Sequence, residues 1–242
     1  MNEITGVEWI AVRSRTVTLS GLFMLSLLAW IYLLSGAGME PMEGMAGMAP
    51  GWPLVAAMWS AMMIAMMVPS AAPVILLYAT VHRRSQDSPP ATAAFLAGYL
   101  ACWLGFSLLA AWLQVAAASP MSMALGSQIV SGTLLIAAGL YQLSPLKDAC
   151  LGRCRSPAQF LARHYRPGPT GVVRLGLLHG AYCLGCCWLL MALLFVVGVM
   201  NIAWVAALTL LVAAEKLLPG GQWIARIAGA GLIAWGALLI AG

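Results

Sequence analysis

Charged side chains are scarce in this sequence. Only 8% of the 242 residues are Asp, Glu, Lys or Arg, and 62% are hydrophobic, whereas an average soluble protein has about 25% charged and about 45–50% apolar residues. So few charges cannot cover a water-exposed surface, which excludes a soluble globular protein. No basic segment is interleaved with aromatic residues, so the net charge of +5 does not indicate a nucleic-acid-binding protein.

Long uncharged stretches fill most of the chain, and about 20 apolar residues suffice for one helix to span a bilayer. Lipid tolerates only helices and closed barrels, and these stretches are too long and too uniformly apolar for barrel strands. The predicted fold is therefore an all-α polytopic transmembrane bundle, a single integral membrane domain over residues 1–242. Seven spans are predicted at roughly residues 17–37, 52–78, 92–117, 125–146, 175–197, 201–218 and 222–241.

The basic residues predict the orientation of this bundle. If the N-terminus is cytoplasmic, all twelve Lys and Arg residues fall on the cytoplasmic side, as the positive-inside bias requires. The first span is interpreted as an uncleaved anchor, because it is longer than the core of a typical signal peptide. The one sizeable polar region is a predicted cytoplasmic loop at 147–174, with a short helix near Pro157–His164 that Ser156 can cap.

Four methionines lie in the predicted outer loop GAGMEPMEGMAGMAPG, at every third position: Met39, Met42, Met45 and Met48. Thioether sulfur is a soft ligand that suits Cu(I), and it does not form disulfides in an oxidising compartment. The alternative is a flexible loop with adaptable apolar side chains. Metal capture is the favoured interpretation, since packing does not explain a fixed spacing in a polar loop.

The second span contains two adjacent rows of methionine at helical spacing. One row is Met58, Met62 and Met66, and the other continues from Trp59 through Met63 and Met67, so together they form a broad thioether face. Packing in the core or against lipid is the commoner meaning of such a stripe. Pro69 and Pro73 free backbone carbonyls in the same helix and are expected to bend it.

The most unusual stretch is HGAYCLGCCWLLM in the fifth span. His179, Cys183 and Cys187 are four residues apart and share one helical face, with Cys186 beside it and Met191 one turn further. These groups can bind a soft metal together with a neighbouring helix, which Gly176, Gly180 and Gly185 allow to approach closely. The alternative is that the cysteines are small apolar residues and the histidine is a buried hydrogen-bonding group.

Three further groups complete the candidate set. Cys150 and Cys154 in the cytoplasmic region match no specific zinc motif, and their two thiols face the same way if the stretch is helical. Glu215 is the one acidic residue within a span, and a carboxylate there is costly unless it is paired. An interfacial charge pair is the favoured interpretation of Glu215, with the Lys216 side chain extending to the interface.

The soft ligands differ between the two predicted sides of the membrane: thioethers lie toward the outer side and thiols toward the cytoplasmic side. The ligand type thus forms a gradient across the membrane. Thiolates hold Cu(I) more tightly, so the gradient predicts a relay from the methionines of the second span through Cys183 to Cys150 and Cys154. A separation of more than about 15 Å between these groups would break the relay, because that is far beyond any sulfur–metal bond length.

The segments MWSAMMIAMMVPSAAP, AGLYQLSPLKDACLGRCRSP, HGAYCLGCCWLLMALLFVVGVMNIAWVAAL and EKLLPGG resemble a family of bacterial predicted metal-binding integral membrane proteins, over roughly residues 52–221. The resemblance implies metal binding at the Cys, Met and His positions named above, and a location in the bacterial inner membrane. It implies no catalytic activity, and a non-enzymatic protein is favoured. The chain has neither the phosphorylation motif nor the nucleotide loop of P-type copper ATPases.

Three functions are compatible with these features. The favoured hypothesis is a Cu(I)-binding membrane protein, with other soft metals as alternatives, that acquires copper or passes it on. A periplasmic copper donor and a membrane cuproenzyme under assembly are its expected partners, besides the lipid bilayer. The second hypothesis is a membrane thiol–disulfide redox protein, and the third is a structural subunit of a larger membrane complex.

Overall fold

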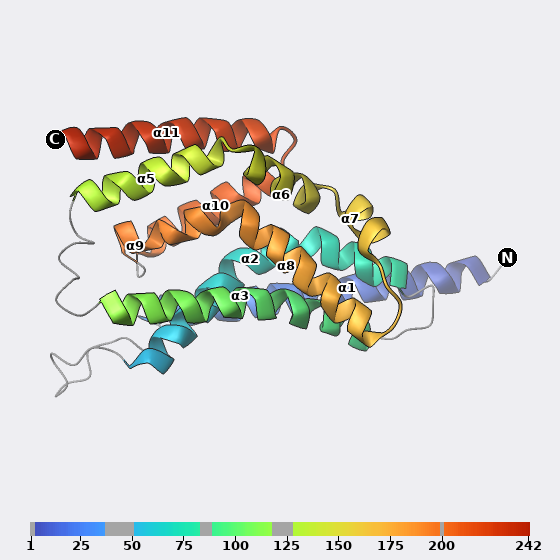
Figure 1. Cartoon of the computed structure of the whole chain (residues 1–242). Coiled ribbons are helices and arrows are strands. Elements are labelled where there is room, and N and C mark those ends of the chain that lie inside the picture. The colour runs from blue at the N-terminus through green and yellow to red at the C-terminus, as the bar shows by residue number, and fades with distance from the viewer. Residues whose placement is uncertain (1–2, 37–50, 83–88, 118–127, 199–200) are drawn as a thin grey trace.

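The computed structural model describes residues 3–36, 51–82, 89–117, 128–198 and 201–242, except for the side chains of residues 3–14, 82, 89, 90, 117 and 197. Every regular element in this part of the chain is helical, as predicted (Figure 1). The helices are α1 (Glu3–Leu34), α2 (Trp52–His82), α3 (Pro89–Ala117), α5 (Gln128–Gln142), α6 (Pro145–Arg155), α7 (Pro157–His164), α8 (Pro169–Ala192), α9 (Leu194–Val197), α10 (Ile202–Leu217) and α11 (Gly221–Ala241).

Five of the described helices are long and apolar enough to cross a membrane. Their apolar segments are Arg15–Leu34, Trp52–Val81, Ala91–Ala116, Pro169–Val196 and Gly221–Ala241. Helices α5 and α6 together make a sixth candidate span, bent by 61° at their junction. The predicted span at 201–218 corresponds to α10, whose 16 residues fall short of the usual length of about 20.

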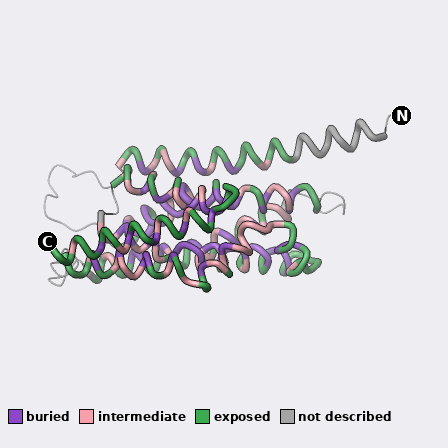
Figure 2. Tube along the Cα trace, turned by 90° about the horizontal axis from the view of Figure 1, so that it is seen from above, coloured by how far each residue is buried: buried purple, intermediate pink, exposed green. Residues whose placement is uncertain are grey.

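The helices form a bundle in which α8 and α10 lie between two outer groups (Figure 1). On one side α5 packs along α11, and on the other α2 packs against α1 and α3, while α8 contacts α3 most extensively. The two chain ends lie at opposite ends of the bundle, and α6 and α7 lie at the end that carries the N-terminus. Figure 2 shows that the buried positions face the interior of this arrangement.

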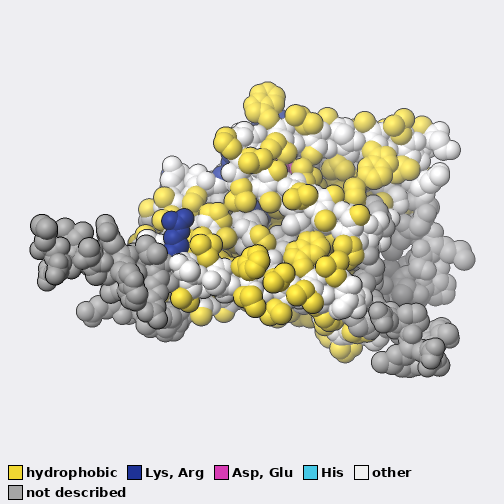
Figure 3. Space-filling view, turned by 180° about the vertical axis from the view of Figure 1, so that it is seen from behind, with side chains coloured by type: hydrophobic (Ala, Val, Ile, Leu, Met, Phe, Trp, Pro, Cys, Tyr) yellow, Lys and Arg dark blue, Asp and Glu magenta, His cyan; other side chains and the backbone are white. Residues whose placement is uncertain are grey.

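The outer surface of the bundle is apolar. Large hydrophobic side chains such as Phe23, Trp112, Ile227 and Leu238 are exposed, and Figure 3 shows hydrophobic side chains across most of one face. The Lys and Arg side chains visible in that view gather toward the end that carries the N-terminus. An exposed apolar band of this extent is the surface that a protein presents to lipid rather than to water.

Glycines bring the central helices into close contact, as predicted for α8. A Cβ at Gly176 would collide with the backbone oxygen of Phe95, and one at Gly180 would lie 2.7 Å from the Cβ of Cys102. A Cβ at Gly185 would lie 3.0 Å from the Sγ of Cys150. Helix α8 therefore approaches α3 on one side and α6 on the other, closely enough for side chains of all three to meet.

The predicted loop at 147–174 is largely helical. The short helix predicted at Pro157–His164 is confirmed as α7, although the Ser156 side chain makes no capping hydrogen bond. The helix α6 was not predicted as an element of its own. It begins at Pro145 because the Ser144 side chain accepts a hydrogen bond from the backbone nitrogen of Lys147 at 3.2 Å, which is a standard N-cap.

Candidate metal centre

The three cysteines of α8 lie together in the interior of the bundle. Cys183, Cys186 and Cys187 are each 1% exposed. The Sγ atoms of Cys186 and Cys187 each donate a hydrogen bond to the backbone oxygen of Cys183 at 3.0 Å. The Cys187 thiol also lies close enough to the other two thiols to interact with them electrostatically. The cluster is therefore a continuous set of three sulfur atoms along one turn of α8.

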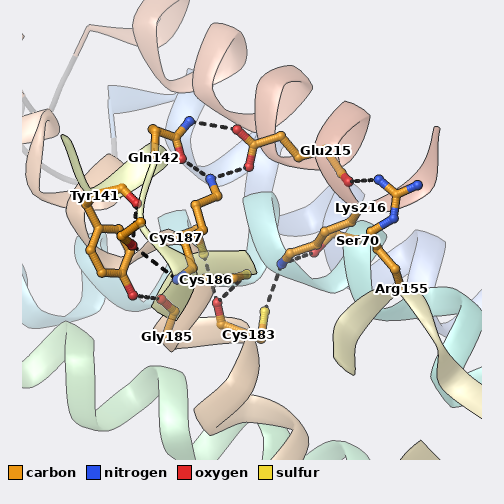
Figure 4. Close-up of polar contacts among 12 residues, drawn as sticks. Ser70, Tyr141, Gln142, Arg155, Cys183, Gly185, Cys186, Cys187, Glu215 and Lys216 are labelled. Carbon is orange, nitrogen blue, oxygen red and sulfur yellow. Dashed lines mark hydrogen bonds and ion pairs between the residues drawn. The ribbon is translucent and has the colours of Figure 1, made fainter. Parts of the chain in front are cut away.

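The sulfur of Cys183 faces two other helices, α10 and α3. The Nζ of Lys216 in α10 donates to it at 2.9 Å (Figure 4), and the Tyr99 hydroxyl of α3 lies 3.2 Å away. Lys216 also donates to the Ser70 hydroxyl of α2 at 3.2 Å. A neighbouring ammonium group favours the thiolate form of a cysteine, which is the form that binds metal.

The interpretation of Lys216 as an interfacial side chain was wrong. Lys216 is 7% exposed and points into the bundle toward the thiols. The sequence did not reveal this contact, because a lysine next to the end of a span usually extends to the interface. Lys147, placed in the cytoplasmic loop by the sequence, is likewise fully buried.

The two thiols of α6 lie next to the α8 cluster. Cys154 lies close enough to the thiol of Cys186 to interact with it electrostatically, and Cys150 packs against Gly185. Both α6 cysteines are half-buried, and all six cysteines of the chain are free thiols. The contacts thus extend the sulfur set from the buried turn of α8 to the less buried helix α6.

The methionines of α2 belong to the core and not to the lipid-facing surface. Met58, Met62, Met63, Met66 and Met67 are each at most 1% exposed, and Met191 of α8 is fully buried.

Pro69 has no backbone N–H, so the backbone oxygen of Ala65, four residues earlier, lacks its usual helical donor. The Ser26 hydroxyl of α1 donates a hydrogen bond to this oxygen instead, at 3.3 Å. Despite Pro69 and Pro73, α2 remains a continuous helix.

Two contacts fix how α2 and α8–α9 lie alongside each other. At one level the rings of Trp59 and Phe195 are 4.9 Å apart. At the other level the Tyr99 hydroxyl donates to the backbone oxygen of Met67 at 3.0 Å and lies beside Cys183. Met62, Met63 and Met66 lie between these levels on α2, while Cys187 and Met191 lie between them on α8. Thioethers therefore lead along the core toward the thiols, as the relay requires.

His179 lies one turn from Cys183 and is 2% exposed. Its ring stacks on Tyr99 with centroids 5.7 Å apart and contacts the ring of Phe160 at 5.2 Å. Its Nδ1 atom is buried and has no hydrogen-bond partner. A neutral imidazole with an unpaired ring nitrogen can act as a metal ligand, and His179 places such a nitrogen one turn from Cys183.

Glu215 points away from the thiols. Its Oε2 forms an ion pair with Lys147 at 2.6 Å, and its Oε1 accepts a hydrogen bond from Gln142 at 2.7 Å (Figure 4). Both carboxylate oxygens are therefore engaged in a buried polar contact. The sequence indicated Glu215 as a residue that needs a partner, but neither Lys147 nor Gln142 was recognised as that partner.

No three His, Cys, Asp or Glu side chains within the described ranges are arranged to hold a metal ion as they stand. The reason is the helical spacing, which directs Cys183 toward α3 and α10 but Cys186 toward α6. Side-chain rotation within the cluster is therefore needed before its sulfurs converge on one ion. Metal ligation by the individual residues stays a prediction, and the four methionines Met39, Met42, Met45 and Met48 lie outside the described residues.

The fold and this site together define a helical membrane protein with a buried, sulfur-rich centre, the donor set that favours a soft metal such as Cu(I). The chain belongs to the PpoB2 family, described as a copper chaperone, whose model matches residues 56–239. Membership implies copper binding, which confirms copper as the predicted metal and copper handling as the predicted function. Neither the curated proteins nor the solved structures gave a match.

Proposed function

We propose that this protein holds Cu(I) at the α8 thiols Cys183, Cys186 and Cys187 and passes it to Cys154 and Cys150 of α6. The observation that carries the proposal is the close grouping of these thiols: Cys186 and Cys187 share the Cys183 carbonyl as hydrogen-bond acceptor, and α6 brings Cys150 against Gly185 of the same turn. Thiolates select Cu(I) over hard cations such as Mg²⁺ and Ca²⁺. The half-buried α6 thiols are the members of the set from which an acceptor can take the ion.

The methionines of α2 are the proposed entry side of this path. Thioether sulfur binds Cu(I) without a proton to lose, and the buried column from Met58 to Met67 leads to the level of Cys183. Met191 and the unpaired Nδ1 of His179 are proposed as additional ligands beside the thiols. Met39, Met42, Met45 and Met48 are the proposed first capture site.

Lys216 has a specific part in this chemistry. An ion held by two thiolates carries a net negative charge, which is unfavourable in the interior of a bundle. The Lys216 ammonium, 2.9 Å from the Cys183 sulfur, offsets that charge. Copper can therefore enter the cluster without leaving an uncompensated charge in the membrane.

We further propose that the N-terminus is cytoplasmic and that the chain crosses the bacterial inner membrane seven times. In this arrangement α5 and α6 form one broken crossing and α10 is a short one. An odd number of crossings agrees with chain ends at opposite ends of the bundle (Figure 1), and the clustered Lys and Arg residues agree with the positive-inside bias. A periplasmic donor and a membrane cuproenzyme under assembly are the proposed partners.

A Cu(I) competition titration tests the proposal. The anaerobically purified full chain is titrated against a chromogenic Cu(I) chelator, beside a variant with Cys183, Cys186 and Cys187 changed to Ser. The matched control is Cys102→Ser, which removes a half-buried thiol of α3 outside the proposed path. We expect the triple variant to lose high-affinity binding and the control to retain it. Equal affinities in all three proteins would refute the assignment.

Thiol–disulfide exchange is the second candidate function, because Cys154 of α6 lies close enough to the Cys186 thiol of α8 to interact with it electrostatically. Such a function requires the pair to cycle between two thiols and a disulfide, with a quinone as the electron acceptor. Alkylation followed by mass measurement distinguishes the candidates. A redox protein adds two fewer alkyl groups after treatment with the quinone, whereas a copper-binding protein alone shows no change.

A further inference from the structure

A buried ionic contact joins α6 to α5 and α10. The Nζ of Lys147 in α6 lies 2.6 Å from the Oε2 of Glu215 in α10, and the two side chains are 0% and 2% exposed. Gln142 of α5 bridges them, since its Nε2 donates to Glu215 at 2.7 Å and its Oε1 accepts from Lys147. We call these three residues the ionic latch (Figure 4).

Burial makes this arrangement sensitive to the loss of either charge. Removing one partner leaves the other charge unpaired in the interior, which is strongly destabilising, whereas apolar residues of similar volume often replace the whole pair without loss. Volume and packing therefore do not require a charge pair here. What an ion pair adds is a defined relative position of the elements that carry it.

The latch lies beside the proposed path of copper. Lys147 is one turn from Cys150 and two turns from Cys154 along α6, and its partner Glu215 is the neighbour of Lys216. Lys216 contacts Cys183, while Glu215 contacts α6. At the far end of α6, Arg155 donates to the backbone oxygens of Glu215 and Leu218 at 2.9 and 2.8 Å.

We propose that Gln142, Lys147 and Glu215 are positioning residues that hold Cys154 of α6 against Cys186 of α8. The role in copper transfer rests on the function proposed above, but the position of the two thiols can be measured without copper. Because α6 continues from α5 through a 61° bend, the α5–α6 junction alone does not fix its position, and the latch joins the first turn of α6 to α10.

Crosslinking in the full-length chain tests this proposal. In the test background, Cys154 and Cys186 are the remaining cysteines and the other four are Ser. In the control background, Cys102 and Cys183 remain, a pair from α3 and α8 that the latch does not contact; Cys102 packs against Gly180, one turn from Cys183. Both proteins are treated with dibromobimane, a small reagent that becomes fluorescent when it joins two thiols. Each background then receives Lys147→Met, Glu215→Gln, or the exchange Lys147→Glu with Glu215→Lys.

We expect either single substitution to slow crosslinking of Cys154 to Cys186 by about tenfold or more, since one charge is left unpaired. The exchange should restore most of the rate, because a flipped Gln142 amide can donate to the carboxylate and accept from the ammonium in their new places. The control pair should react equally in all variants.

Unchanged crosslinking of Cys154 to Cys186 in the single variants would overturn the proposal. Equal loss in both backgrounds would also overturn it, because the latch would then stabilise the whole bundle. No copper is present, so failure here is distinct from failure of the copper assignment.

Discussion

Gly180 links the packing of the bundle to its thiol cluster, and Gly180→Ala tests that link. A Cβ at this position would lie 2.7 Å from the Cβ of Cys102 and 3.1 Å from the backbone oxygen of Tyr99. Two carbon atoms pack best at about 3.5–4.0 Å, so the added methyl group must push α3 and α8 apart locally by about 0.8–1.3 Å. Neither neighbour is the flexible end of a side chain, and the strain cannot be relieved by a rotamer change.

The displacement has consequences for both stability and the site. Overpacking of this kind costs about 1–3 kcal/mol, and the better helix propensity of Ala recovers up to about 1 kcal/mol. Tyr99 moves with Cys102 on α3, so its 3.2 Å contact with Cys183 and its 3.0 Å hydrogen bond to Met67 lengthen beyond hydrogen-bonding range. We expect a net loss of about 1–2 kcal/mol together with weaker Cu(I) binding.

Reversible unfolding in mixed detergent micelles and the chelator competition measure these two effects. The matched control is Gly105→Ala in α3, where an added Cβ meets no atom within 4 Å. That control should gain about 0.5–1 kcal/mol from the loss of a glycine in a helix, without any change in copper affinity. If Gly180→Ala is as stable as Gly105→Ala and binds copper as the unchanged chain does, the packing argument is wrong.

Three further substitutions have defined outcomes. Ser26→Ala should lower the free energy of unfolding by about 1 kcal/mol, because the Ala65 oxygen loses its donor. Pro69→Ala restores a backbone donor to this oxygen, so in that background unfolding measurements should show almost no effect of Ser26→Ala. Replacing all five α2 methionines by Leu conserves side-chain volume, at a cost of less than about 1.5 kcal/mol each. The helix content measured by circular dichroism should therefore persist, while copper uptake falls. Uptake at the original rate would exclude an entry role for these methionines. Lys216→Met should weaken Cu(I) binding by about tenfold or more in competition titrations, since a hydrogen bond to a charged group contributes about 1.5–3 kcal/mol. Unchanged affinity would show that Lys216 does not support copper binding.

The helices of the bundle could be predicted from composition alone, because long uncharged stretches in a membrane have few alternatives. The predicted boundaries of the second span and of the helix at Pro157–His164 agree with the structure. The number of spans could not be fixed in the same way. Helix α10 is short, and the break after Gln142 depends on a cap at Ser144 that hydropathy does not report.

The candidate site was predictable in its sulfur atoms and not in its polar surroundings. Helical spacing placed the α8 cysteines on one turn, and the glycines of α8 indicated the close approach of α3 and α6. The contacts of Lys216 with Cys183 and of Lys147 with Glu215 depend on how separate helices meet. The spacing of residues within one helix carries no information about such contacts between helices. The general cost of an ionisable group within a span was the one available signal.

The central claim is that copper is held by the buried sulfur atoms of α8. X-ray absorption at the copper edge of the anaerobically loaded full chain tests this claim most directly, because it identifies the atoms bound to the ion. We predict a first shell dominated by sulfur in the unchanged protein and in Cys102→Ser. The same spectrum should change in the variant with Cys183, Cys186 and Cys187 replaced by Ser. A first shell of nitrogen and oxygen in the unchanged protein, or an identical sulfur shell in the triple variant, would contradict the claim.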